Sequence, residues 1–140
     1  MERPEAHGRA APSSLQEIRP LVLIDTTQLA LERSISGAAQ RHEALAANIA
    51  NASTPGYRRV DVDFHGALAA ALGTGDKAAV EHTAFSAQAD STVGVTQADG
   101  NSIDPYNESA KLAANALEQQ AAVSVMKART AIIRSALGVA

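Results

Sequence analysis

Apolar side chains recur at steps of three and four residues through the first third of the chain. The positions on this seam, one of them polar, are Leu31, Ile35, Ala38, His42, Leu45, Ile49 and Ala52. A seam sustained for about three heptads is typical of a helix that packs lengthwise on another helix. We therefore predict a helix over residues 25–52, capped by Asp25 with Gln28 three residues later. His42 is expected to be an interface histidine, with a pH-sensitive or ligand-binding role as the alternative.

The helical pattern stops within the stretch Asn51-Ala52-Ser53-Thr54-Pro55-Gly56-Tyr57. Asn51 and Ser53 compete for backbone hydrogen bonds, and Pro55 disfavours the α conformation for the residue before it. Gly56 can adopt the positive φ that the second central position of a type II turn requires. The sequence thus predicts a helix that ends abruptly and a chain that leaves it in a fixed direction.

Asn48 and Asn51 lie three residues apart and share one face of the predicted helix, beside the seam. Short polar side chains of this type help to end a helix. A polar side chain at a helix interface can also fix the register between two helices. Two roles for Asn48 follow: helix termination, or specific hydrogen bonds to a neighbouring chain.

The segment from Val60 to His65 alternates between apolar and polar residues, which predicts a short strand or extended arm. The alternation places Asp61, Asp63 and His65 on one side, where such groups could coordinate a metal ion. Any half-buried strand has a polar face, however, and no fourth ligand lies nearby in the sequence, so we expect no metal site. A short helix is predicted over residues 67–72, and irregular structure with a β-turn or two over residues 76–97.

A second long helix is predicted over residues 104–138, with Asp104 as N-cap, Pro105 at its first position and Gly138 as its stop. One apolar stripe on this helix comprises Leu112, Ala116, Val123, Met126, Ile133 and Leu137. An adjoining stripe comprises Ala114, Leu117, Ala121, Val125, Ala128 and Ile132. Together the stripes exceed the roughly 100° apolar face of a surface helix, so we expect other subunits to bury what one partner helix cannot.

Composition supports a mainly α protein made of long helices. The chain has 140 residues, 46% hydrophobic but only 3% aromatic, and much of the apolar fraction is alanine. Alanine favours helix but contributes little buried area per residue. We expect residues 25–140 to form one domain, with a mostly irregular middle segment over 53–103. Residues 1–24 lack periodicity and are expected to form a mobile arm.

Charge and residue types exclude several functions. A net charge of −3 leaves no basic footprint for nucleic acid, and the absence of cysteine excludes disulfides and thiolate chemistry. The four histidines lie in four different segments, and no nucleophile or metal motif accompanies them, so we expect no enzyme, cofactor or small-molecule substrate. The apolar run at 21–24 is too short for the core of a cleaved signal peptide. A generic helical coiled-coil adaptor would explain the helices but not the Thr54-Pro55-Gly56-Tyr57 turn.

Two stretches of the sequence carry a family resemblance. The string Ala47-Asn48-Ile49-Ala50-Asn51, followed by Thr54-Pro55-Gly56-Tyr57, resembles the signature of bacterial flagellar rod and hook (axial) proteins. Farther on, Asp99-Gly100-Asn101-Ser102-Ile103-Asp104, with Asn115 and the segment 119–121 beyond it, resembles the C-terminal part of FlgB-type proximal rod subunits. FlgB-type chains usually begin close to the first helix, so residues 1–24 depart from the pattern.

The resemblance implies a structural subunit of the proximal rod of the flagellar basal body. It implies terminal helices that pair as an antiparallel coiled coil and line a helical tube around the export channel. Implied partners are other rod subunits, proteins at the junction of the rod and the membrane ring, and the flagellar type III export apparatus. The implied location is the periplasm-spanning rod, reached without a cleaved signal peptide. A sister rod subunit of the same superfamily is the alternative.

Two sets of residues are expected to carry assembly. The turn motif comprises Asn48, Ile49, Asn51, Thr54, Pro55, Gly56 and Tyr57. The helix-packing set comprises Leu31, Ile35, Leu45, Leu112, Leu117, Val123, Met126, Ile132, Ile133 and Leu137.

Overall fold

The computed structural model describes residues 25–90 and 98–138, and these are mainly helical. In chain order the elements are α1 (Thr26–Ala50), β1 (Val60–Asp61), α2 (Phe64–Gly73), α3 (Lys77–Glu81), β2 (Gln88–Ala89) and α4 (Pro105–Ala136). The mobile arm predicted for residues 1–24 lies outside the described residues. None of the helices in the described ranges combines the length and the apolar character needed to cross a membrane.

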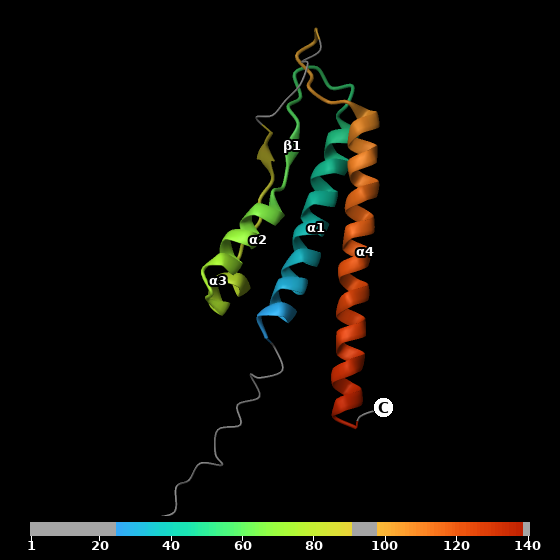
Figure 1. Cartoon of the computed structure of the whole chain (residues 1–140). Coiled ribbons are helices and arrows are strands. Elements are labelled where there is room, and N and C mark those ends of the chain that lie inside the picture. Colours follow the sequence, from blue (N-terminus) through green and yellow to red (C-terminus); the bar gives the residue numbers. More distant parts are fainter. Residues whose placement is uncertain (1–24, 91–97, 139–140) are drawn as a thin grey trace, which may run out of the picture.

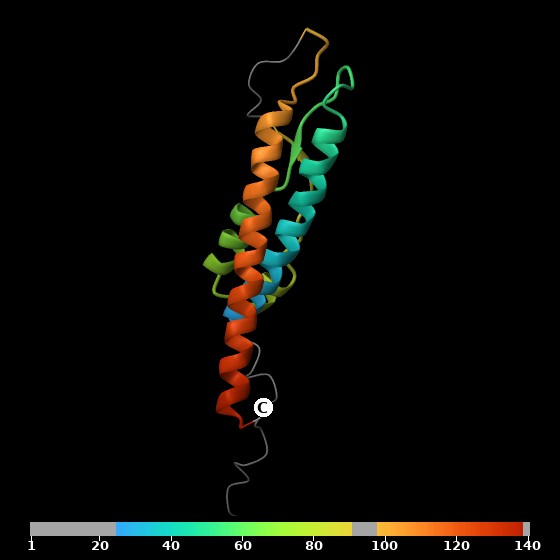
Figure 2. The same ribbon diagram turned by 90° about the vertical axis from the view of Figure 1, so that its right-hand side faces the viewer.

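Helix α1 lies between α4 on one side and the smaller unit of α2, α3 and the β1–β2 ribbon on the other (Figure 1). Helices α1 and α4 run side by side, and α4 extends beyond the start of α1 (Figures 1 and 2). Strand β1 and the start of α4 lie beside the end of α1 (Figure 1), so distant segments of the chain meet there.

Local capping sets the boundaries of the long helices. The Asp25 carboxylate accepts from the Gln28 backbone N–H at 2.9 Å, as expected for an N-cap. The side chain of Gln28 donates to Glu32 rather than back to the cap, so only half of a capping box forms. At the start of α4 the Asp104 carboxylate accepts from two backbone N–H groups, and the proline that follows occupies the first turn, as predicted.

One cluster of buried apolar side chains lies between α1 and the β1–α2 segment. Its members are Ala38, Ala44, Val62 and Phe64. The Phe64 ring rests directly on the backbone of α1, because a Cβ built on Gly37 would lie 2.5 Å from the Phe64 Cβ. Phe85 then meets Phe64 edge-on, with ring centroids 6.2 Å apart. A glycine in α1 therefore admits the largest core side chain.

The middle segment differs from its prediction. The strand expected from Val60 to His65 covers only two residues, which pair antiparallel with β2. The prediction failed beyond Asp61 because the Asp63 carboxylate accepts from the Gly66 backbone N–H at 2.9 Å and starts α2 at Phe64. The irregular structure expected over 76–97 was also wrong for α3, which begins after an Asp76 N-cap, and for β2.

The two apolar stripes predicted on α4 differ in exposure. Much of the first stripe is half-buried toward the rest of the chain. The second stripe is exposed, with Leu117 68%, Val125 54% and Ile132 70% accessible. His42, expected at the helix interface, is exposed as well.

Candidate functional site: the junction at the end of α1

The turn after α1 has the predicted form. Asn51 caps the helix, and its side-chain amide donates to the Ala47 carbonyl at 2.9 Å. The Tyr57 N–H donates to the Thr54 carbonyl at 3.2 Å, which closes a four-residue turn around Pro55 and Gly56. Gly56 has φ +71°, the positive value that the second central position of a type II turn requires. The exit direction from α1 is thus fixed by the backbone itself.

The segment before α4 lies against this turn and ties it down. Asn101 is fully buried, and its side-chain amide donates to the carbonyls of Asn51, Ala52 and Thr54 at 3.1, 3.0 and 2.8 Å. Its side-chain oxygen accepts from the Ile103 N–H at 2.7 Å. One amide from about fifty residues away thus hydrogen-bonds three carbonyls of the turn that follows α1.

The side chain of Asn48 hydrogen-bonds the segment that follows the turn. Its side-chain amide donates to the Val60 carbonyl at 2.7 Å and to the Glu108 carboxylate at 2.8 Å. The Val60 N–H in turn donates to the Asn48 side-chain oxygen at 3.0 Å. This fully buried side chain therefore pairs with strand β1 as a neighbouring strand would, and also reaches α4.

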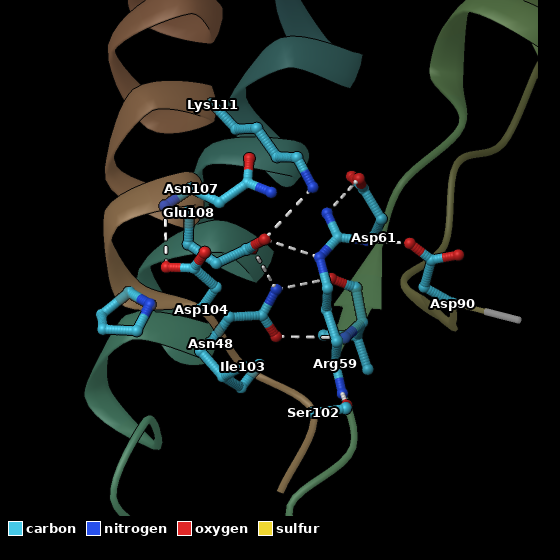
Figure 3. A network of polar contacts seen from close by, with 12 residues as sticks. Asn48, Arg59, Asp61, Asp90, Ser102, Ile103, Asp104, Asn107, Glu108 and Lys111 are labelled. Atoms are coloured by element: carbon cyan, nitrogen blue, oxygen red, sulfur yellow. Dashed lines mark hydrogen bonds and ion pairs between the residues drawn. The ribbon is translucent and has the colours of Figure 1, made fainter. Parts of the chain in front are cut away.

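Arg59 is the centre of a buried ion-pair network (Figure 3). Its Nε donates to Glu108 at 2.6 Å, and one terminal nitrogen donates to Asp61 at 2.7 Å. The other terminal nitrogen contacts the Asp90 carboxylate. Lys111 also reaches Glu108, at 3.3 Å. Strand β1, the residue after β2 and the first turns of α4 are thereby joined through one guanidinium.

The charges of this network are matched. Arg41 on α1 forms a further pair with Asp61 at 2.9 Å. Burial raises the pKa of Asp61, but hydrogen bonds from Arg41 and Arg59 outweigh it and hold that pKa below its usual value. Burial lowers the pKa of Arg59, but hydrogen bonds with Glu108 and Asp61 outweigh it and raise that pKa. Asp61 and Arg59 are thus both stabilised in their ionised forms, as a buried ion pair requires.

The structure brings much of the predicted turn motif together at this junction. Asn48, Asn51, Thr54 and Tyr57 take part in the hydrogen bonds described above, and the Gly56 N–H donates to the Asp99 carbonyl at 3.0 Å. Pro55 is exposed and Ile49 is half-buried. Neither role considered for Asn48 describes it, because its bonds are to β1 and α4 of its own chain.

The predicted helix-packing residues fall into three groups. Leu45 is fully buried. Half-buried are Leu31, Ile35, Leu112, Val123, Met126 and Ile133. Exposed are Leu117, Ile132 and Leu137.

The three residues considered as metal ligands each make contacts with different partners. Asp61 belongs to the ion-pair network, and Asp63 caps α2. His65 contacts Glu118 on α4 through an exposed pair.

Sequence reasoning missed the charged centre of the junction. Arg59 and Glu108 were not singled out, although Arg59, just before β1, and Asp61 are two residues apart and carry opposite charge, which was an available signal. Asn115, which was part of the resemblance only, is buried and donates to the Ala38 carbonyl of α1 at 2.8 Å. Amides and charges at one end of α4 thus hold it to α1.

Comparison with known proteins agrees with this geometry. The family model described as flagella basal body rod protein matches residues 34–58, which cover the second half of α1, its turn and the residues leading to β1. The matched residues thus include Asn48 and the turn at Pro55 and Gly56.

Several curated relatives are similar over much of the chain. The flagellar basal body rod protein FlgB of Salmonella typhimurium (strain LT2) is 38% identical over 104 residues, 63% of this chain and 75% of that protein. FlgB of Escherichia coli (strain K12) is 34% identical over the same extent. FlgB of Aeromonas hydrophila is 33% identical over 116 residues, 74% of this chain and 86% of that protein. The chain belongs to the FlgB family of flagellar basal body rod proteins.

Proposed function

We propose that this chain is a structural subunit of the proximal rod of the flagellar basal body and assembles there with other rod subunits. Its family is structural rather than enzymatic. The observation that carries the proposal is the division of α4 into two parts. Its first turns are locked to the junction by buried polar groups, while its later turns leave Leu117, Val125 and Ile132 exposed. Exposed apolar stripes of this kind mark protein interfaces.

The long helices are proposed to pair as an antiparallel coiled coil within one domain spanning residues 25–140. Three contacts support this arrangement: Asp25 with Arg129, the Ala38 carbonyl with Asn115, and Asn48 with Glu108. Positions later in α1 contact positions earlier in α4. In the assembled rod, the turn motif would set the angle at which each subunit's middle segment leaves its helix pair.

Partners beyond the rod follow from the same proposal. The chain would contact proteins at the junction of the rod and the membrane ring, and the flagellar type III export apparatus would deliver it without a cleaved signal peptide. Its location would be the periplasm-spanning rod. The neighbours found in basal bodies test this placement.

The test is a deletion combined with a map of neighbours. Cells lacking this chain are expected to be non-motile and to form membrane rings without rods, and the intact chain supplied from a plasmid should restore both. Cross-linking in basal bodies isolated from the restored cells should place the chain at the base of the rod. Motile cells without the chain would contradict the proposal, and cross-links confined to the distal rod would favour a sister subunit.

A further inference from the structure

The side of α4 that meets α1 continues past the start of α1. Helix α1 begins just after Asp25, whose carboxylate contacts Arg129 of α4. Helix α4 runs on from there for about two more turns and extends beyond the start of α1 (Figures 1 and 2). Ile133 and Leu137 follow Arg129 at steps of four residues, so they prolong the same side of the helix. We call Ile133 and Leu137 the α4 end seam.

The α4 end seam is partly covered, although α1 stops short of it. Ile133 is half-buried, whereas its neighbour Ile132 is 70% exposed. At the start of the seam the Arg129 Nε is buried and donates to no acceptor within residues 25–90 and 98–138. A buried donor of this kind calls for an acceptor close by. A hollow of about 720 Å³ lies beside the seam, and its lining includes Met126, Thr130, Ala131 and Arg134.

The chain itself brings apolar side chains to this place. The run Leu21-Val22-Leu23-Ile24, which lies outside the described residues, directly precedes Asp25 in the sequence. Asp25 has φ −89° and ψ 173°, so the chain enters α1 from an extended residue and not from a longer helix. In an extended segment alternate side chains point to the same side. Leu21 and Leu23 would therefore share one side, and Ile24 would face the other.

The spacing of the two leucines matches that of the α4 end seam. An extended residue spans about 3.3–3.6 Å, which would place Leu23 about 7 Å and Leu21 about 14 Å from the N-cap of α1. A helix rises about 1.5 Å per residue, which places Ile133 about 6 Å and Leu137 about 12 Å beyond Arg129. Because the N-cap carboxylate contacts Arg129, both series start at the same level and stay in step.

We propose that residues 21–24 run in extended form along the α4 end seam of their own chain. Leu23 covers Ile133, and Leu21 covers Leu137. The occupant is the chain's own segment and not a second copy, because its covalent link to the N-cap holds the leucines beside the seam at a high effective concentration. The contact lies within one chain, so the inference goes beyond the proposed rod function and does not rest on it.

Two further features of this end of the molecule fit the segment. Ile24 occupies the position before the N-cap, where an apolar side chain packs on the fourth residue of the helix, here Leu29. Leu29 is only 7% exposed, although it lies in the first turns of α1. The carbonyls of an extended segment have no helical partners, so one of them can accept from the buried Arg129 Nε.

Disulfide closure tests the contact, since the chain contains no cysteine of its own. In the dilute, purified full chain, Leu23→Cys and Ile133→Cys should form a disulfide within one chain on mild oxidation, detected as a linked peptide by mass spectrometry. Moving the second cysteine by one residue, to Ile132→Cys, turns it outward and is the matched control, which should stay reduced. Equal closure of the two pairs would overturn the proposal.

The other outcomes of this experiment are equally decisive. Closure of Leu21→Cys with Ile133→Cys in place of the Leu23→Cys pair would indicate a helical continuation of α1 and overturn the extended register. Disulfide-linked dimers would assign the seam to a second copy. Absence of closure both in the purified chain and in isolated basal bodies would overturn the contact. None of these results depends on whether the chain builds rods, so the proposed function can stand or fall separately.

Thiol labelling measures the coverage without a disulfide. Ile133→Cys should react with a maleimide several-fold more slowly than Ile132→Cys, and Leu23→Asp in the same chain should remove most of that difference. Val22→Asp, on the opposite side of the extended segment, is the matched control and should preserve it. Slow labelling of Ala44→Cys, a buried position of α1, shows in each background that the chain stays folded. Equal effects of the two aspartates would overturn the proposal.

Discussion

The two halves of α4 differ in what they bury. In the first half, Glu108 and Asn115 are only 1% and 2% exposed, and both hydrogen-bond to other elements. In the second half no residue of α4 is buried, and Ile132 is 70% exposed. One helix thus carries a polar surface that its own chain covers completely and an apolar surface that its own chain leaves open.

This difference separates folding from assembly. Buried amides and ions are directional, so they fix a single arrangement of α1, β1 and α4 and tolerate little change. Apolar surface is non-directional and can be buried against whichever subunit presents a complementary shape. Changes to the buried amides and ions of the junction are therefore expected to destabilise the fold itself, and changes to the exposed apolar residues in the second half of α4 to affect mainly the assembly.

Removing the buried carboxylate should have the largest effect. Glu108→Ala leaves the Arg59 guanidinium buried beside an empty position and removes one acceptor of Asn48. Breaking a buried pair in this way costs about 3–5 kcal/mol of unfolding free energy. Urea unfolding followed by circular dichroism measures the loss. Glu118→Ala, which removes an exposed partner of His65, is the control and should cost less than about 1 kcal/mol. Equal losses of unfolding free energy in Glu108→Ala and Glu118→Ala would contradict the division of α4 into a part with buried polar groups and an exposed part.

The packing of Phe64 on α1 gives the next largest effect. Gly37→Ala places a methyl group 2.5 Å from the Phe64 Cβ, and overpacking of this kind costs about 1–3 kcal/mol. Gly73→Ala, where a Cβ meets nothing within 4 Å, should instead gain up to about 1 kcal/mol from helix propensity. The same unfolding measurement separates the two. A stabilised Gly37→Ala protein would show that Phe64 does not rest on this glycine.

Local signals explain which parts of this fold the sequence predicted. Asp25, Asp104 and Pro105 act on residues within one turn of them, so the starts of α1 and α4 could be predicted, as could the turn at Gly56. Asp63 and Asp76 carry the same kind of signal, yet alternation from Val60 to His65 led to the prediction of a longer strand, and weak patterning over residues 76–97 led to that of an irregular segment.

The junction could not be predicted in the same way. Asn48 meets Glu108 across sixty residues, and Asn101 meets the end of α1 across fifty. No periodicity in one segment specifies which distant side chain will face it. The resemblance identified the strings that contain Asn48 and Asn101, but their contact became visible only in the folded chain.

Strain at the turn should have a moderate effect on the chain and a large one on assembly. Gly56→Val forces a β-branched residue to φ +71°, which costs more than about 1–2 kcal/mol. We expect near-normal expression and export but no rods and no motility, scored in isolated basal bodies. Gly75→Val imposes the same strain at φ +70° between α2 and α3, away from the junction, and should leave rods intact. Motile cells with a stable Gly56→Val protein would show that the turn is not needed for assembly.

Acid should weaken the junction through Asp61. Its folded pKa is lowered below the ordinary value of 3.8, so the stability it contributes is present above that value. That contribution is lost as pH falls through the lower folded pKa. Asp61→Asn should therefore melt at a lower temperature than the parent at pH 7, and the difference should shrink below about pH 3.8. A difference that stayed constant with pH would assign the loss to packing rather than to charge.

The open half of α4 should show the smallest effect on folding. Ile132→Gln changes a side chain that is 70% exposed and that no other element of the described chain covers, so unfolding free energy should stay within about 0.5 kcal/mol of the parent. Incorporation into basal bodies should nevertheless fall sharply, because a polar amide replaces apolar surface that a neighbouring subunit is expected to bury. Immunoblots of isolated basal bodies against total cell protein measure this ratio. Ala131→Gln, at the adjacent exposed position outside the second apolar stripe of α4, is the matched control. If both variants were incorporated equally well, the exposed stripe would carry no assembly contact, and the division of α4 would reflect folding alone.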